Sequence, residues 1–358
     1  MTRQLSPIER QIVWDRLIAV VEDQATALLR TAFSTIVREC GDLSAGVFDV
    51  RGRMLAQAVT GTPGHVNSMA ESVKHFLDRF PPDTMKEGDV FITNDPWKGT
   101  GHLNDFVVTT PAFHRGRLVG LFSCTSHITD IGGIGFGPDA KDVYMEGIAL
   151  PFIRIADAGR LNREVIEICR ANSRLPVEME GDVYSLINCN DVGVRRLKET
   201  MEEFGLEDLG EVADHIVDAS RAAVLSALAA VPAGTYRNEM RIDGYDRPID
   251  LVARVSVSAD GVSVDYDGTS PQEARGINVP LSYTTAYTCF GLMCAIAPDV
   301  PNNAGSLSVF RVTAPAGSIV NAVRPAAVSS RHIVGQMLPD VVFGALRQAI
   351  PDRCPAEG

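Results

Sequence analysis

The spacing of apolar residues along the first forty positions predicts a long amphipathic helix. Ser6, Pro7 and Glu9 form a helix start, because serine caps a helix, proline suits its first position and glutamate completes a capping box. Apolar side chains then recur every three or four residues, which is the helical period. We expect one helix that runs to about Glu39 and stops near Gly41.

The pattern then changes to short alternating runs. Residues 43–57 alternate between apolar and polar side chains around a central Arg-Gly pair, which is typical of a β-hairpin. The stretch 66–80 returns to helical spacing and stops at two prolines. A short strand follows and ends in the turn-forming residues Asn94 and Asp95.

Two longer apolar runs, 106–113 and 117–126, flank a polar turn and predict a second antiparallel hairpin. With the turn centred near residues 115 and 116, the numbers of paired residues sum to about 231. Asn104 would then lie opposite His127. Histidines and aspartates therefore gather at the open end of this hairpin; they are His102, Asp105, His127 and Asp130.

The predicted secondary structure of the second half of the chain changes near residue 230. Helical spacing dominates the stretch up to residue 230, and the sequence becomes strand-rich beyond it. We predict an α+β fold with mixed, largely antiparallel sheets, packed helices and a two-part architecture. Residues 1–230 would form a helix-and-hairpin region that carries the site, and residues 231–358 a strand-rich region with a buried C-terminal helix.

Composition narrows the class of protein. The 358 residues carry a net charge of -12, which argues against binding to a nucleic-acid backbone. No apolar run approaches the roughly 20 residues that cross a bilayer, and the N-terminus lacks the apolar core of a signal peptide. The seven cysteines include no CxxC pair, which fits a protein of the reducing cytoplasm.

The candidate chemistry lies in a repeated His-x-x-Asp motif. His102 and Asp105 form the first copy, and His127 and Asp130 the second. Imidazole and carboxylate ligands together suit Mn, Zn or Fe, and such an ion can lower the pKa of a bound water. The alternative is that these polar residues only cap strand ends. Because both motifs converge in one hairpin, the metal site and the capping role both stay open as hypotheses.

Further candidate residues lie in the flanking loops. His65 precedes a predicted helix N-terminus, where anions can bind; a capping or core role is the alternative. We assign His65 and Asp130 as candidate catalytic groups. Substrate binding is assigned to two turns, Asn94 with Asp95 and the glycine-rich loop at Gly132 and Gly133. The chain lacks a P-loop motif and a GxSxG motif, so these two motifs support neither ATP binding nor a serine nucleophile.

Several stretches resemble the hydantoinase B/oxoprolinase family, in family order over nearly the whole chain. They include "RECGDLSAGVFDVRGRMLAQ", "GDVFITNDPWKGTGHLNDFVVTTPAF", "SHITDIGG", "EGIALPFIRI" and "VDYDGTSPQ". Family members include subunits of ATP-dependent hydantoinases, the C-terminal half of 5-oxoprolinase, lactamase subunits and acetone-type carboxylase subunits.

The resemblance implies a divalent metal site. In the carboxylase relatives a glutamate, a His-x-x-Asp pair and a second histidine hold the ion. These positions correspond to Glu39, His102, Asp105 and His127, with Asp42 as an alternative carboxylate close to Glu39. Asp130 would then orient a ligating histidine or act as a base.

The resemblance also implies a division of labour in a hetero-oligomer. An A-type partner with an actin-like ATP fold would use ATP and Mg²⁺ to phosphorylate a carbonyl of a small-molecule substrate. In a hydrolase, this chain would then cleave an activated cyclic amide. An acetone-type carboxylase subunit is the alternative. Family members continue beyond the last residue here, so the C-terminal region is expected to be incomplete and a non-catalytic scaffold is a third hypothesis.

Overall fold

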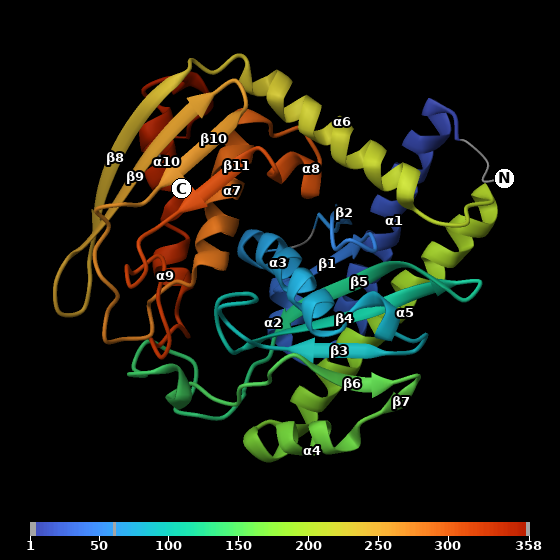
Figure 1. Ribbon diagram of the computed structural model, residues 1–358. Helices are drawn as coiled ribbons and strands as arrows, with labels where there is room; N and C mark the ends of the chain where they lie inside the picture. The colour runs from blue at the N-terminus through green and yellow to red at the C-terminus, as the bar shows by residue number, and fades with distance from the viewer. Residues whose placement is uncertain (1–4, 60–61, 356–358) are drawn as a thin grey trace. The chain divides into compact units, whose positions relative to one another are not determined.

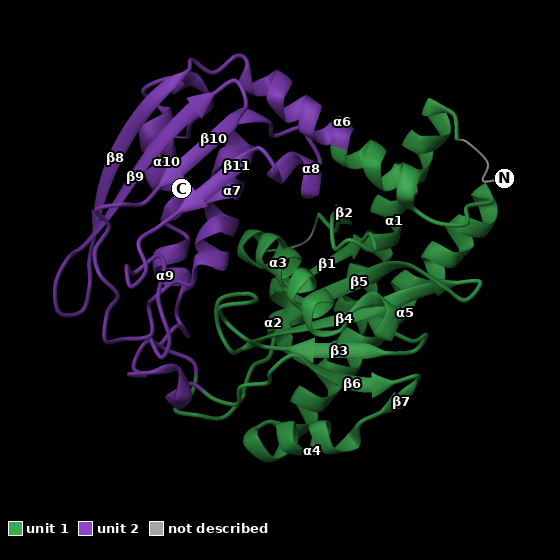
Figure 2. Ribbon diagram, in the orientation of Figure 1, with its two compact units in different colours: residues 1–135, 147–217 green, residues 136–146, 218–358 purple. Residues whose placement is uncertain are grey.

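The computed structural model describes residues 5–59 and 62–355 of the chain (Figure 1). The chain divides into two compact units (Figure 2). Unit 1 comprises Met1–Gly135 and Gly147–Val217, and unit 2 comprises Phe136–Glu146 and Asp218–Gly358. The division therefore falls inside the helix α6 (Gly210–Leu228), and the short segment 136–146 joins the second unit.

Unit 1 is built on a seven-stranded sheet with the strand order β2-β1-β5-β4-β3-β6-β7. All neighbouring strands are antiparallel. Helix α3 covers one face of the central strands, and α1 and α5 cover the other (Figure 1). The strands are β1 (Leu43–Phe48), β2 (Met54–Gln57), β3 (Val90–Thr93), β4 (Asp105–His114), β5 (Arg117–His127), β6 (Ile153–Asp157) and β7 (Arg160–Leu161).

The helices of this unit largely follow the predicted apolar spacing. Burial on both faces explains why β4 and β5 do not alternate between apolar and charged side chains, and carry apolar residues and small hydroxyl residues on both faces. The helices are α1 (Pro7–Thr31), α2 (Thr35–Cys40), α3 (Pro63–Arg79), α4 (Arg163–Asn172), α5 (Pro176–Phe204) and the first part of α6.

The prediction of a single N-terminal helix is wrong, because the helix is interrupted at residues 32–34, between α1 and α2. The capping box at Ser6 and Glu9 is present, and Gly41 ends α2 with φ of 64°. Between the two helices, the backbone N–H groups of Phe33 and Ser34 donate to Oδ1 of Asp182 on α5, at 2.7 and 3.1 Å. A side-chain acceptor from another helix therefore takes two donors that a continuous helix would use internally.

The hairpin of β4 and β5 has the predicted turn but not the predicted register. Arg115 and Gly116 both have positive φ, as a type I′ turn requires, and paired numbers near the turn sum to 231. A bulge between Ala112 and Phe113 then shifts the pairing by one. Beyond it Asp105, not Asn104, lies opposite His127.

Unit 2 has a four-stranded sheet with the order β11-β10-β9-β8, in which only the β10–β11 pair is parallel. Helices α7 and α10 pack together, and α10 lies against β8 and β9. The expected single C-terminal helix is two, α9 and α10. The elements are β8 (Gly234–Ile242), β9 (Ile249–Ser258), β10 (Gly261–Asp265), β11 (Phe310–Thr313), α7 (Leu281–Ile296), α8 (Ala304–Leu307), α9 (His332–Gly335) and α10 (Leu338–Leu346).

Both units combine helices with mostly antiparallel sheets, so the predicted α+β class is confirmed. Across residues 5–59 and 62–355, no helix has the length and apolar character needed to cross a membrane. The seven cysteines all lie within these ranges and are unpaired.

Candidate metal centre

A row of polar residues crosses three adjacent strands at one end of the large sheet. Asp105 begins β4 and lies directly opposite His127, the last residue of β5. On the other side of β5, the His127 N–H donates to the carbonyl of Asp42, which immediately precedes β1. Directly opposed residues of antiparallel strands point to the same face. The row Asp42–His127–Asp105 therefore lies on the face that α3 covers.

Asp105 is the centre of this group. Its side chain is 0% exposed, and its Oδ1 lies 2.6 Å from Nε2 of His102 and 3.3 Å from Nδ1 of His127. His102 comes from the loop three residues before β4. One ligand atom from each of His102, Asp105 and His127 can be chosen so that all lie within 4.8 Å of one another. All three residues are buried.

His65, in the first turn of α3, connects Asp105 to Asp42. Its Nε2 lies 2.9 Å from Oδ2 of Asp105, and its Nδ1 lies 3.4 Å from Oδ1 of Asp42. The hydroxyl of Thr62 donates to the same Asp42 oxygen at 3.0 Å. The structure thus gathers three histidines and two aspartates, the fifth member being Asp42.

Two of the candidate residues lie apart from this cluster. Glu39 is on the exposed end of α2, outside the group of close ligand atoms. Asp130 is paired with Arg174, whose Nε and Nη2 donate to its carboxylate at 2.6 and 3.0 Å. The Arg174 guanidinium lowers the pKa of Asp130 through these bonds. Asp130 is therefore held as a carboxylate in an ion pair.

The residues assigned to substrate binding shape the loops around the cluster. Asn94 is buried, and its amide donates to the carbonyls of Leu103 and Ile148 while its oxygen accepts from the N–H of Leu150. These bonds fix the loop that carries His102. Asp95 accepts from the N–H of Trp97 in a tight turn.

The glycine-rich loop is held by the end of α4 and the short segment that joins α4 to α5. Gly132 and Gly133 have positive φ, and their carbonyls accept from the Arg174 guanidinium at 3.0 and 3.3 Å. A Cβ at Gly132 would lie 2.3 Å from the carbonyl oxygen of Asn172, so only glycine fits there.

The chemistry of the donor set fits a divalent transition metal. Imidazole nitrogens and carboxylate oxygens are the ligands that Zn, Mn and Fe accept, and buried carboxylates are stable when paired or bound to metal. The cluster contains no thiolate, which disfavours a structural zinc site of the cysteine type.

The sequence alone did not single out the buried carboxylate Glu146. It belongs to unit 2, where its Oε1 accepts from the N–H groups of Val328 and Ser329 at 2.6 and 2.7 Å. Burial raises the pKa of Glu146 to about 7. No local motif marks a glutamate that contacts residues about 180 positions away.

Comparison with known proteins now identifies the family. The hydantoinase B/oxoprolinase family model matches residues 6–358. The chain belongs to this family, as the motifs predicted.

Three proteins are similar to this chain, two of them also in sequence and one in fold only. A putative D-/L-hydantoinase subunit of Pseudomonas sp. (strain NS671) is 31% identical over 99% of this chain and 63% of its own length. The crystal structure of ATP-dependent caprolactamase from Pseudomonas jessenii matches with a TM-score of 0.89 and 27% identity, over 98% of this chain and 62% of that one. The nucleotide-free structure of acetone carboxylase matches with a TM-score of 0.88 over 97% of this chain and 48% of that one; at 19% identity, this likeness concerns the fold alone.

This chain spans less than two-thirds of the length of each of these three proteins.

Proposed function

We propose that this chain is the metal-bearing B-type subunit of an ATP-dependent cyclic-amide hydrolase. The substrate class is a hydantoin, 5-oxoproline or a lactam. Membership of the hydantoinase B/oxoprolinase family and the likeness to an ATP-dependent caprolactamase support this proposal. The observation that carries it is the buried cluster of His102, Asp105 and His127, whose ligand atoms converge at one end of the sheet.

The metal would be held by His102, Asp105 and His127, with Asp42 as the further carboxylate. Asp42 lies in the same row of the sheet and contacts His65, whereas Glu39 is exposed on α2. We therefore favour Asp42 over Glu39. When bound, a divalent ion such as Zn, Mn or Fe would supply a Lewis acid and would lower the pKa of a coordinated water.

The residues around the cluster have separate tasks in this proposal. His65 orients Asp105 through its Nε2 and is our candidate to carry a proton to or from a bound substrate. Asp130, together with Arg174, orders the loop at Gly132 and Gly133, which we assign to substrate contact along with Asp95. Asn94 supports this region by fixing the His102 loop.

A partner subunit completes the proposed reaction. The hydantoinase relative is named as one subunit of its enzyme, which implies a second subunit there. We propose that an A-type partner binds ATP and Mg²⁺ and phosphorylates the carbonyl oxygen of the cyclic amide, which makes the carbonyl carbon a better electrophile. This chain then receives the activated substrate. We expect the complex to work in the cytoplasm, in line with the unpaired cysteines.

The test is elemental analysis of the complex with its A-type partner, followed by ATP-dependent substrate turnover. We expect bound divalent metal in the wild type and its loss in His102→Ala and His127→Ala. His75→Ala is the matched control, because His75 lies on the same helix as His65 and pairs weakly with Asp78. ATP turnover should depend on a hydantoin, 5-oxoproline or a lactam.

Two outcomes would contradict the proposal. ATP turnover that requires bicarbonate and a ketone would identify a carboxylase subunit instead. A wild-type complex without divalent metal, or histidine variants with unchanged metal content, would leave a scaffold role.

A further inference from the structure

A pair of hydroxyl groups lies next to the candidate metal centre, on the same face of the sheet. Ser44 of β1 lies directly opposite Thr125 of β5. Each is two residues along its strand from a member of the polar row, Ser44 from Asp42 and Thr125 from His127. Because side chains alternate with a period of two, the hydroxyl pair and the polar row face the same side.

Both hydroxyls are fully buried, and no residue that the structure describes is hydrogen-bonded to either of them. Ser44 and Thr125 are each 0% exposed. Among the described residues, neither Oγ of Ser44 nor Oγ1 of Thr125 forms a hydrogen bond. Buried polar groups without a partner are rare and costly, and they call for an explanation such as an ordered water or a functional role.

The next row of the sheet shows what a satisfied pair looks like. There Thr109 of β4 lies opposite Ser123 of β5, and their hydroxyls are 2.9 Å apart. Ser123 also donates to the carbonyl of Val108. Two pairs of equally buried hydroxyl side chains therefore differ: the pair Thr109–Ser123 is hydrogen-bonded, and the pair Ser44–Thr125, beside the candidate metal centre, is not.

The nearby helix does not supply the missing partners. Helix α3 covers this face, with Met69 close to Gly46. Ser68, one turn after His65, turns its hydroxyl back to the carbonyls of Gly64 and His65. On β4 the residue opposite Thr125 is Val107, which offers no polar side-chain group.

The spacing of the two rows fits one water molecule. Two residues along a strand correspond to roughly 6.8 Å. A single water with two hydrogen bonds of about 2.8 Å each spans most of that distance. A buried water also needs two to four polar partners, and two hydroxyls with a carboxylate provide three.

We propose that Ser44 and Thr125 hold a buried water that links them to the carboxylate of Asp42 and so positions the metal-binding row. The water accepts hydrogen bonds from both hydroxyls and donates one to Asp42. Ser44 and Thr125 are therefore positioning residues that act on the ligands through this water. This inference rests on the proposed metal function for its consequence, since partners that orient ligands tune metal affinity.

The test compares Thr125→Val and Ser44→Ala with the control Thr109→Val, all in the full chain with its partner. Metal affinity is measured by competition with a chelator, and stability by the melting temperature. We expect Thr125→Val to weaken metal binding about tenfold with little change in melting temperature, because no protein group loses a partner. Thr125→Ser should restore wild-type affinity. Thr109→Val should show the opposite signature, a lower melting temperature with unchanged metal affinity.

A high-resolution crystal structure gives an independent result. Density for a water within hydrogen-bond distance of both hydroxyls supports the inference. Direct bonding of the two hydroxyls to each other, or unchanged metal affinity in both variants of a metal-bound protein, overturns it. If the wild type binds no metal, the proposed function fails. The presence or absence of this water in the crystal structure then tests, independently of metal, whether Ser44 and Thr125 hold a water.

Discussion

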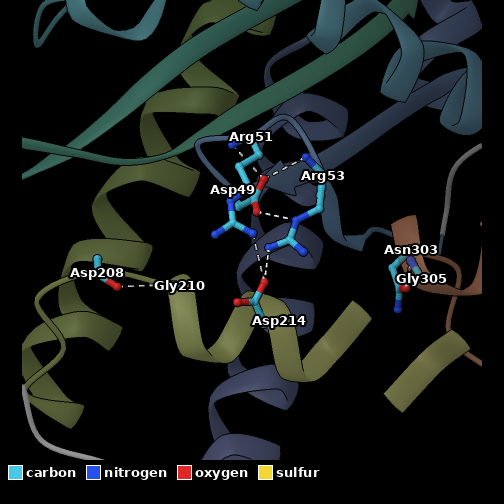
Figure 3. A network of polar contacts seen from close by, with 8 residues as sticks. All are labelled: Asp49, Arg51, Arg53, Asp208, Gly210, Asp214, Asn303 and Gly305. Carbon is cyan, nitrogen blue, oxygen red and sulfur yellow. Dashed lines mark hydrogen bonds and ion pairs between the residues drawn. The ribbon is translucent and has the colours of Figure 1, made fainter. Parts of the chain in front are cut away.

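Strand β1 is flanked by a carboxylate at each end, and the two carboxylates contact different kinds of side chain: Asp42 an imidazole and Asp49 a guanidinium. Asp42 precedes the strand and contacts the imidazole of His65. Asp49 follows it and accepts from the backbone of Arg51 and Arg53 and from the Arg53 side chain, at 2.7 to 3.0 Å (Figure 3). Arg53 also reaches Asp214 on α6 at 2.6 Å.

The difference separates a structural network from a candidate reactive one. Guanidinium groups carry a permanent charge, so Arg51 and Arg53 together balance the charges of Asp49 and Asp214, and the network ties the β1–β2 turn to α6. At the other end, the wholly buried Asp105 has three imidazoles as its close partners. Imidazoles supply a positive charge only when protonated, and they are good metal ligands when neutral. That end of the strand is therefore the one suited to an added cation.

The largest expected effect comes from Asp105→Asn, which preserves shape and removes the charge. We expect the affinity for divalent metal to fall by more than about a hundredfold, which exceeds the 10–100-fold typical of residues that only orient ligands. Elemental analysis and chelator competition measure it. Asp49→Asn is the matched control at the other end of β1 and should keep full metal content. Equal metal loss in both variants would contradict the distinction between the metal-binding end and the guanidinium end of β1.

Much of this site followed from local sequence. The hairpin turn at Arg115 and Gly116 and the two His-x-x-Asp motifs placed His102, Asp105 and His127 at one end of a sheet. The exact register did not follow, because a β-bulge leaves no clear signature in strands that do not alternate between apolar and polar residues.

Contacts between distant segments were the part that sequence could not provide. Asp182 interrupts the N-terminal helix from a position about 150 residues away. His65 joins the cluster because α3 packs over the sheet, whereas Asp130, which the motif favoured, is paired with Arg174. Apolar periodicity predicts which face of an element is buried, but not which polar side chain meets it there.

Glu146 in unit 2 shows a third way to accommodate a buried carboxylate. Burial raises its pKa from 4.5 to about 7, although the N–H groups of Ser329 and Val328 and the charge of Arg331 act in the opposite direction and Asp142 adds to the rise. A raised pKa favours the protonated form in the folded state. The contribution of Glu146 to the stability of the folded protein is therefore fully present below pH 4.5 and is lost as the pH rises through about 7.

We expect Glu146→Gln to remove this dependence, because glutamine keeps an acceptor for both N–H groups and carries no charge. Between pH 4.5 and 8 the wild type should lose roughly 3 kcal/mol of stability relative to the variant, at about 1.4 kcal/mol for each pH unit of the shift. Chemical denaturation at several pH values measures it. Parallel stability curves for the two proteins would show that Glu146 does not titrate in this range.

The next effect distinguishes Asp42 from Glu39 as the further carboxylate. Asp42→Asn should weaken metal binding by about ten- to a hundredfold, because it lies in the row with His127 and Asp105. Glu39→Gln should leave the affinity unchanged, because Glu39 is exposed at the end of α2. Chelator competition on both variants decides between them. The reverse pattern would return the assignment to Glu39.

The smallest effects test the guanidinium end of β1. Arg53→Ala should cost about 2 kcal/mol of unfolding free energy, since Asp49, with its side chain 5% exposed, loses its charged partner. Arg51→Ala should cost no more than about 0.5 kcal/mol, because its pair with Asp214 joins side chains that are 63% and 51% exposed. Neither change should alter metal content, which denaturation and elemental analysis check together. Metal loss in Arg53→Ala would mean that the two ends of the strand are coupled, and the contrast between a structural and a reactive end would no longer hold.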